Sequence, residues 1–249
     1  MASARPRSRA ETSRGAAGRG MQYTPSMRFV DASDSSVLVI FGDTISPELN
    51  AEVVALFHAL EALRKPFIHN LHPAYASLLI DFDPLQVSHA DVHALVEQLK
   101  RGTAHRRQES RMVQIPVCYG GEFGPDLADL ARHSGMTAEE VILAHSSASY
   151  TVYFLGFAPG FAYMGGLPEA IAAPRLDTPR KVVPAGSVGI AGSQTGVYPL
   201  DSPGGWRLIG RTPLRMFDAN AELPALLQPG DQVRFAAIDR TAYDGSVDR

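Results

Sequence analysis

The residues most suited to binding or catalysis are two arginines and a pair of glycines within the segment 153–212. Gly204-Gly205 precedes Arg211 by a short strand, and Arg180 lies upstream. Adjacent glycines let backbone N–H groups point into one concavity, and arginines add positive charge beside it. This combination is typical of a site for a phosphate or a carboxylate. The composition leaves an alternative open, in which the glycines serve ordinary turns and the arginines are solvated.

The segment around these residues must itself be folded. It holds eleven of the 22 glycines together with seven prolines, a mixture that excludes a helix. It also holds large aromatic side chains that need burial, so a disordered linker is excluded as well. What remains is compact β-structure whose turns bring backbone close to another strand, a partner chain or a ligand.

Histidine and cysteine offer fewer options. His145 closes a predicted helix, where it could interact with the helix dipole or act in catalysis. His89 and His93 have i,i+4 spacing without an evident third metal ligand, which favours a solvated helix face. Cys118 lies in a predicted strand and is interpreted as a packed thiol rather than a nucleophile. No P-loop, dinucleotide-binding fingerprint or nucleophile elbow is present, so charge stabilisation and ligand positioning are the expected chemistry.

Composition narrows the class of protein. The chain has 249 residues, a formal net charge of −3 and one cysteine, a profile that fits a globular protein without a disulfide framework or a need for nucleic acid. No apolar run approaches the roughly 18 residues that cross a membrane, and we expect a cytoplasmic protein. Residues 1–26 are predicted to be a disordered extension. Residues 1–20 carry five arginines and one acidic residue, and Met21 or Met27 could be the working start.

The first half of the chain predicts a small α+β domain over residues 27–102. Ser46-Pro47 is a helix start, and Ser88 can cap a second helix that ends near Gly102. Alternating apolar residues predict four strands, Arg28–Ala32, Ser36–Phe41, Phe67–Leu71 and Ala76–Phe82. The order is ββαββα, and we expect a ferredoxin-like α/β sandwich.

The polar stretch 102–110 is the predicted linker to a second domain, 111–240. A strand at Met112–Cys118 is followed by a helix from Gly124-Pro125-Asp126 to Gly135. Thr137 and Glu140 then form a capping box for a helix over Ala138–His145. β-structure dominates from Ser149 to Ala237, which predicts an antiparallel β-barrel with two short helices.

Several long motifs identify a family. They are His145-Ser146, Tyr153–Phe161, Gly165–Pro168, Pro179-Arg180, Val183–Val188, Ala191–Pro199, Ser202–Trp206 and Ile209–Pro213. Together they resemble the PxpB family of 5-oxoprolinase proteins, also known as allophanate hydrolase subunit 1, which includes the kinase inhibitor KipI. The resemblance covers about residues 27–239. It implies a cyclophilin-like barrel for the second domain.

The resemblance also implies an activity and partners. The family opens 5-oxoproline to glutamate with ATP, together with a homologous PxpC-like protein and a PxpA-like protein, and Mg²⁺ is expected with the nucleotide. A five-membered lactam is a poor electrophile, so phosphorylation of the amide oxygen would create a leaving group, with arginines and backbone N–H groups spreading the charge. Candidate catalytic residues are His145, Arg180 and Arg211. Substrate or nucleotide contacts are expected from Phe157, Pro159, Gly160, Phe161, Pro184, Gly186, Ser187, Gln194, Thr195, Gly196, Ser202, Pro203, Gly204, Gly205, Trp206 and Thr212.

Two alternatives stay open. The same barrel could dock on a sensor histidine kinase and inhibit it, as a KipI-type protein. A carboxyltransferase component that acts on a urea-like amide is a weaker alternative, because it would need a biotin-carrying partner and this chain has no Met-Lys-Met acceptor motif.

Overall fold

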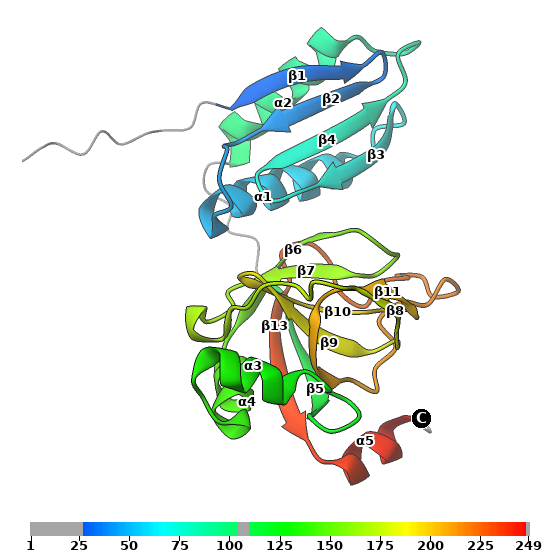
Figure 1. Cartoon of the computed structure of the whole chain (residues 1–249). Coiled ribbons are helices and arrows are strands. Elements are labelled where there is room, and N and C mark those ends of the chain that lie inside the picture. Colours follow the sequence, from blue (N-terminus) through cyan, green and yellow to red (C-terminus); the bar gives the residue numbers. More distant parts are fainter. Residues whose placement is uncertain (1–26, 104–109, 248–249) are drawn as a thin grey trace, which may run out of the picture.

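A computed structural model of the chain describes residues 27–103 and 110–247 (Figure 1). The extension expected over 1–26 and most of the predicted linker lie outside the described residues. The N-terminal part contains β1 (Arg28–Ser33), β2 (Ser36–Ile40), α1 (Pro47–Leu63), β3 (Ile68–Pro73), β4 (Ser77–Phe82) and α2 (His89–Thr103). The predicted ββαββα order is confirmed.

The N-terminal sheet is antiparallel throughout, with the strand order β1-β2-β4-β3. Alternate residues of its two central strands face both helices and form one core with them: Val37, Val39, Leu78, Ile80, Phe82, Val53, Leu56, Leu60, Val92 and Val96. The ferredoxin-like expectation is not confirmed, since that fold runs βαββαβ and here each helix follows a pair of adjacent strands.

Local capping signals place the helix starts where the sequence predicts them. The Ser46 hydroxyl accepts a hydrogen bond from the Leu49 backbone N–H, and Pro47 occupies the first turn. Thr137 and Glu140 form the predicted capping box, with reciprocal hydrogen bonds of 3.2 and 2.8 Å. These contacts satisfy backbone donors that a helix cannot pair internally.

The C-terminal part begins with β5 (Met112–Tyr119), α3 (Leu127–Ser134), α4 (Ala138–Ser147), β6 (Tyr150–Leu155), β7 (Ala162–Gly165) and the 3₁₀ turn η1 (Glu169–Ile171). It continues with β8 (Arg180–Val183), β9 (Ser187–Ala191), β10 (Gln194–Val197), β11 (Ser202–Gly204), β12 (Arg207–Arg211), β13 (Gln232–Ile238) and α5 (Arg240–Val247). The sequence analysis does not predict α5.

Seven of these strands close a barrel in the order β10-β7-β6-β13-β5-β12-β9. The expectation of a purely antiparallel barrel is wrong, because β13 lies parallel to β5 over its whole length (Figure 1). The barrel interior is filled by side chains such as Ile115, Tyr150 and Met164. It is therefore a packed core and not a ligand channel.

Strands β8 and β11 form a separate two-stranded ribbon, and Val183 of β8 shares a buried cluster with Ala191 of β9 and Leu208 of β12. Between the ribbon and the barrel lies a second core of Phe161, Val183, Ala191, Tyr198, Trp206 and Leu208. The Gly- and Pro-rich segment thus folds into two β-layers, as its composition predicts.

The two parts of the chain meet at a polar seam. The Asn50 side-chain amide donates to the carbonyl oxygens of Ala74, Tyr75 and Tyr153, and the Tyr75 hydroxyl donates to Gln194 Oε1 at 2.8 Å. These contacts join α1 and the β3–β4 turn to strands β6 and β10.

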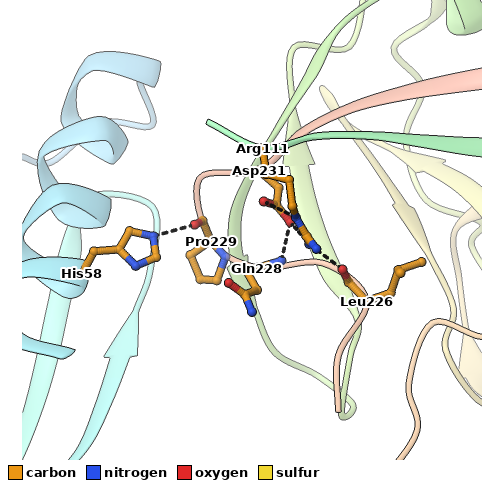
Figure 2. A network of polar contacts seen from close by, with 6 residues as sticks. All are labelled: His58, Arg111, Leu226, Gln228, Pro229 and Asp231. Atoms are coloured by element: carbon orange, nitrogen blue, oxygen red, sulfur yellow. Dashed lines mark hydrogen bonds and ion pairs between the residues drawn. The ribbon is translucent and has the colours of Figure 1, made fainter. Parts of the chain in front are cut away.

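A second contact closes the same seam (Figure 2). His58 Nε2 of α1 donates to the Pro229 carbonyl at 3.1 Å. The loop that carries Pro229 is held by Asp231, whose carboxylate accepts from Arg111 and from the Gln228 backbone N–H. The loop that His58 contacts is therefore held in place by hydrogen bonds within the barrel part of the chain.

Candidate functional site

The site is built on Asp126, a residue at the start of α3 that the sequence analysis does not include among the candidates. Its Oδ2 accepts from the Leu208 backbone N–H at 2.7 Å, and its own N–H donates to the Leu208 carbonyl. Its Oδ1 accepts from Arg180 Nη2 at 2.6 Å. The carboxylate thus ties the loop before α3 to β12 and holds the Arg180 guanidinium over the outer face of that strand.

Arg211 lies further along the same strand. Its guanidinium carbon sits 5.7 Å from the centre of the Phe123 ring, a cation–π contact with the loop that also carries Asp126. Its neighbour across the ladder is Ser187 of β9. Arg180 and Arg211 therefore both border the layer between the β8–β11 ribbon and the barrel.

This layer holds polar atoms that have no partner. Within residues 27–103 and 110–247, six buried side-chain nitrogen or oxygen atoms lack a hydrogen bond. Four of them lie on the strands β8, β9, β11 and β12: Arg180 Nη1, Ser187 Oγ, Ser202 Oγ and Arg211 Nε. Register places Ser187 opposite Arg211, and Ser202 opposite Val183 at the end of β8. We call these four residues the polar layer.

Buried polar atoms are nearly always paired in folded proteins, so atoms without a protein partner are normally satisfied by a water, an ion or a ligand. Guanidinium N–H groups and hydroxyls are hydrogen-bond donors that suit an anion, although all four atoms are buried in this structure. Arginine side chains are positively charged in proteins. The anion site that the sequence predicts around these arginines stays a prediction.

The turn before β9 frames this layer. Gly186 has a φ of 79°, and a Cβ there would lie 2.4 Å from the Thr212 carbonyl oxygen and 3.3 Å from Arg211 Cγ. Only glycine tolerates both the backbone angle and the contact. Pro184 and Thr212 flank the turn, with the Ser187 N–H donating to the Pro184 carbonyl and the Thr212 N–H donating to the Gly186 carbonyl.

His145 lies elsewhere, in the barrel interior, where it has no exposed surface. The Tyr119 hydroxyl donates to Nδ1 at 2.8 Å, and Nε2 donates to Thr195 Oγ1 at 3.0 Å. The Thr195 hydroxyl can serve as this acceptor because it donates its own proton to the Gly189 carbonyl. Burial lowers the pKa of His145 to about 3, so the ring is neutral.

This arrangement contradicts the expected catalytic role for His145 and the ligand contact expected for Thr195. A side chain that is enclosed in the core and hydrogen-bonded at both nitrogens does not reach a substrate. The two residues instead link α4 to β10 and β9 inside the barrel.

Several expected ligand contacts are core residues. Phe161 and Trp206 pack edge to face, with ring centroids 5.4 Å apart. A Cβ on Gly196 would lie 3.0 Å from Phe161, and one on Gly204 would lie 2.3 Å from the Tyr198 hydroxyl oxygen. These glycines allow aromatic rings to pack closely against backbone, and their predicted ligand contacts stay predictions.

The remaining residues predicted to contact a ligand lie outside the polar layer and outside the aromatic core. Phe157 is 61% exposed with a φ of 66°, at the tip of a loop whose Gly160 touches Phe217 and whose Pro159 is exposed. Gln194 belongs to the domain seam, where its Nε2 is buried without a described partner. Pro203 is exposed and lies within β11. Gly205 has room for a side chain, because an added Cβ would lie 3.6 Å from its nearest neighbour, Pro179.

Comparison with known proteins defines the class. Residues 27–227 match the family described as carboxyltransferase domain, subdomain C and D. The fold agrees: the urea amidolyase of K. lactis superposes with a TM-score of 0.70 at 20% identity, over 90% of this chain and 16% of that chain. The chain is a carboxyltransferase-domain protein.

Closer relatives narrow this class. The chain is 44% identical over 221 residues to the B-type subunit of 5-oxoprolinase, PxpB, from Bacillus subtilis (strain 168), covering 84% of this chain and 92% of that protein. It therefore belongs to the PxpB family of 5-oxoprolinase proteins. The crystal structure of TTHA0988 superposes with a TM-score of 0.75 at 38% identity, over 82% of this chain. That match spans only 40% of the TTHA0988 chain.

No helix among the described residues is long and apolar enough to cross a membrane. The same residues contain no group of three or more histidine, cysteine or acidic side chains placed to hold a metal ion.

Proposed function

We propose that this chain is the PxpB component of an ATP-dependent 5-oxoprolinase, which opens 5-oxo-L-proline to L-glutamate in complex with a homologous PxpC-like protein and a PxpA-like protein. The observation that carries the proposal is the match to the Bacillus subtilis relative over 92% of its length. The TTHA0988 chain supports the proposal of a partner protein. The match covers only 40% of that chain, so the same fold is there joined to further sequence. We place the protein in the cytoplasm and propose that its barrel is cyclophilin-like.

The polar layer is the proposed site of charge stabilisation. ATP supplies phosphorylation of the lactam oxygen, which turns a poor electrophile into one with a leaving group. Arg180 and Arg211 are suited to bind the carboxylate or phosphoryl oxygens, and Ser187 and Ser202 can donate further hydrogen bonds. Any Mg²⁺ would arrive with the nucleotide phosphates, since the described part of the chain offers no cluster of ligands for it.

The test is reconstitution. The chain is mixed with the PxpC-like and PxpA-like proteins, and 5-oxoproline-dependent ATP hydrolysis is measured. Arg211→Ala should lower the turnover of the assembled complex by at least about tenfold, because a charge-assisted contact contributes about 1.5–3 kcal/mol. Arg207→Ala is the matched control: this partly exposed arginine of the same strand donates to the Pro174 carbonyl and should leave turnover unchanged.

Three outcomes would argue against the proposal. The wild-type complex could lack 5-oxoproline-dependent ATP hydrolysis. The chain could instead inhibit a sensor histidine kinase at stoichiometric concentration, which is the KipI-type alternative. Transfer of a carboxyl group to a urea-like amide, given a biotin-carrying partner, would favour the carboxyltransferase alternative. Loss of assembly in Arg211→Ala would show that the arginine belongs to an interface with a partner protein.

A further inference from the structure

An open hollow of about 520 Å³, which we call the pocket, is lined in part by the Gly186 turn. Residues of the segment 212–219 and Tyr243 of α5 also border it. Its wall is mainly apolar and includes Pro199, Leu200, Pro213, Leu214, Phe217 and Tyr243. The volume falls within the roughly 300–1,000 Å³ that small-molecule sites occupy.

The pocket and the polar layer share a wall. Gly186 and Thr212 line the pocket, while a Cβ on Gly186 would lie 3.3 Å from Arg211 Cγ. The next residue of the turn, Ser187, contributes an unpaired hydroxyl to the polar layer. Arg211 and Ser187 do not line the pocket and their unpaired atoms are buried, so the Gly186 turn separates a ligand in the pocket from the polar layer.

We propose that the pocket binds the base of the adenine nucleotide. This inference rests on the proposed function, which supplies the nucleotide. A purine is planar and largely apolar on its faces, and the aromatic side chains of Phe217 and Tyr243 offer surfaces on which it can pack. An apolar side chain of a partner protein is the competing occupant.

The experiment uses photo-crosslinking of the reconstituted complex with 8-azido-ATP, followed by mass-spectrometric mapping. The wild-type complex should be labelled on the 212–219 segment or on the peptide with Tyr243, and excess ATP should prevent labelling. Ala219→Trp fills the pocket from an exposed position on its rim and should abolish this label. It should also raise the KM for ATP by at least about tenfold. Ala90→Trp, at an exposed alanine of α2, is the matched control and should behave as wild type.

The outcomes separate the two proposals. Labelling confined to a partner protein, or unchanged labelling and KM in Ala219→Trp, overturns the nucleotide pocket while ATP-coupled turnover by the same complex upholds the proposed function. An azide label on the predicted peptides without 5-oxoproline turnover supports the pocket and contradicts the oxoprolinase assignment. Loss of complex assembly in Ala219→Trp, but not in Ala90→Trp, identifies the pocket as a partner's docking site and also overturns the inference.

Discussion

Replacing Asp126 by alanine tests whether one carboxylate organises the candidate site. Its side chain is 8% exposed and is bound on one oxygen to Arg180 and on the other to the Leu208 backbone N–H. Asp126→Ala leaves a buried donor unpaired and removes the counter-charge of a guanidinium whose side chain is 29% exposed. Breaking a buried pair on one side costs about 3–5 kcal/mol, so we expect a loss of stability of that order.

The assay is thermal unfolding followed by circular dichroism. For a chain of this size about 1 kcal/mol corresponds to about 2–4 °C in Tm, which predicts a fall of about 6–20 °C for Asp126→Ala. Asp126→Asn should lose less, because an amide oxygen can still accept from the Leu208 N–H. Asp129→Ala is the matched control on the same helix. Its carboxylate is 53% exposed and pairs with Arg132, which is 77% exposed, so Tm should stay nearly unchanged.

The reasoning would be refuted if Asp126→Ala and Asp129→Ala lowered Tm equally. A double-mutant cycle with Arg180→Ala gives a second check. If the ion pair couples the two residues, the double variant should lose less stability than the sum of the single variants. Additive losses would show that Asp126 acts only through its contact with β12.

Two further predictions follow from the packing of the barrel. Gly204→Ala should destabilise the protein by about 1–3 kcal/mol in urea unfolding, because the new methyl would lie 2.3 Å from the Tyr198 hydroxyl oxygen, whereas Gly205→Ala should be nearly neutral; equal losses would contradict the packing role. The second concerns pH. Because the folded pKa of His145 is depressed to about 3 from the usual 6.5, the stability due to its neutral form is complete above pH 6.5 and declines as the pH falls toward 3. His145→Gln should flatten this part of the pH profile of urea unfolding, and an unchanged slope would show that other groups set it.

Local signals account for what the sequence predicts correctly. Ser46-Pro47 and the Thr137–Glu140 box each act within one helical turn, so their contacts can be inferred without knowing the fold. The parallel pairing of β13 with β5 joins residues that are about 120 positions apart, from Met112 to Gln232. No local pattern encodes such a pairing, and the expected antiparallel barrel was wrong for that reason.

The same distinction applies to the site. Arg180 and Arg211 stand out in the sequence because charge is scarce in their Gly- and Pro-rich segment. Their partners Asp126 and Phe123 lie more than 50 residues away and look like ordinary residues of a helix start. Gly196 and Gly204 resemble ligand-binding glycines in the sequence, but a missing Cβ also allows close aromatic packing, and the structure shows aromatic rings beside both.

The contrast between His145 and the two arginines supports the proposal that the polar layer binds an anion. A buried histidine meets the cost of desolvation by losing its proton, and His145 does so inside the barrel. Arginine cannot lose its charge, so a partly buried guanidinium needs a counter-charge. Asp126 serves Arg180, and Glu122 on the same loop pairs with Arg240. Among the described residues no carboxylate forms an ion pair with Arg211, so the layer carries more positive than negative charge. An anionic ligand that binds there restores the balance, and its binding is therefore coupled to the stability of the ribbon and the barrel.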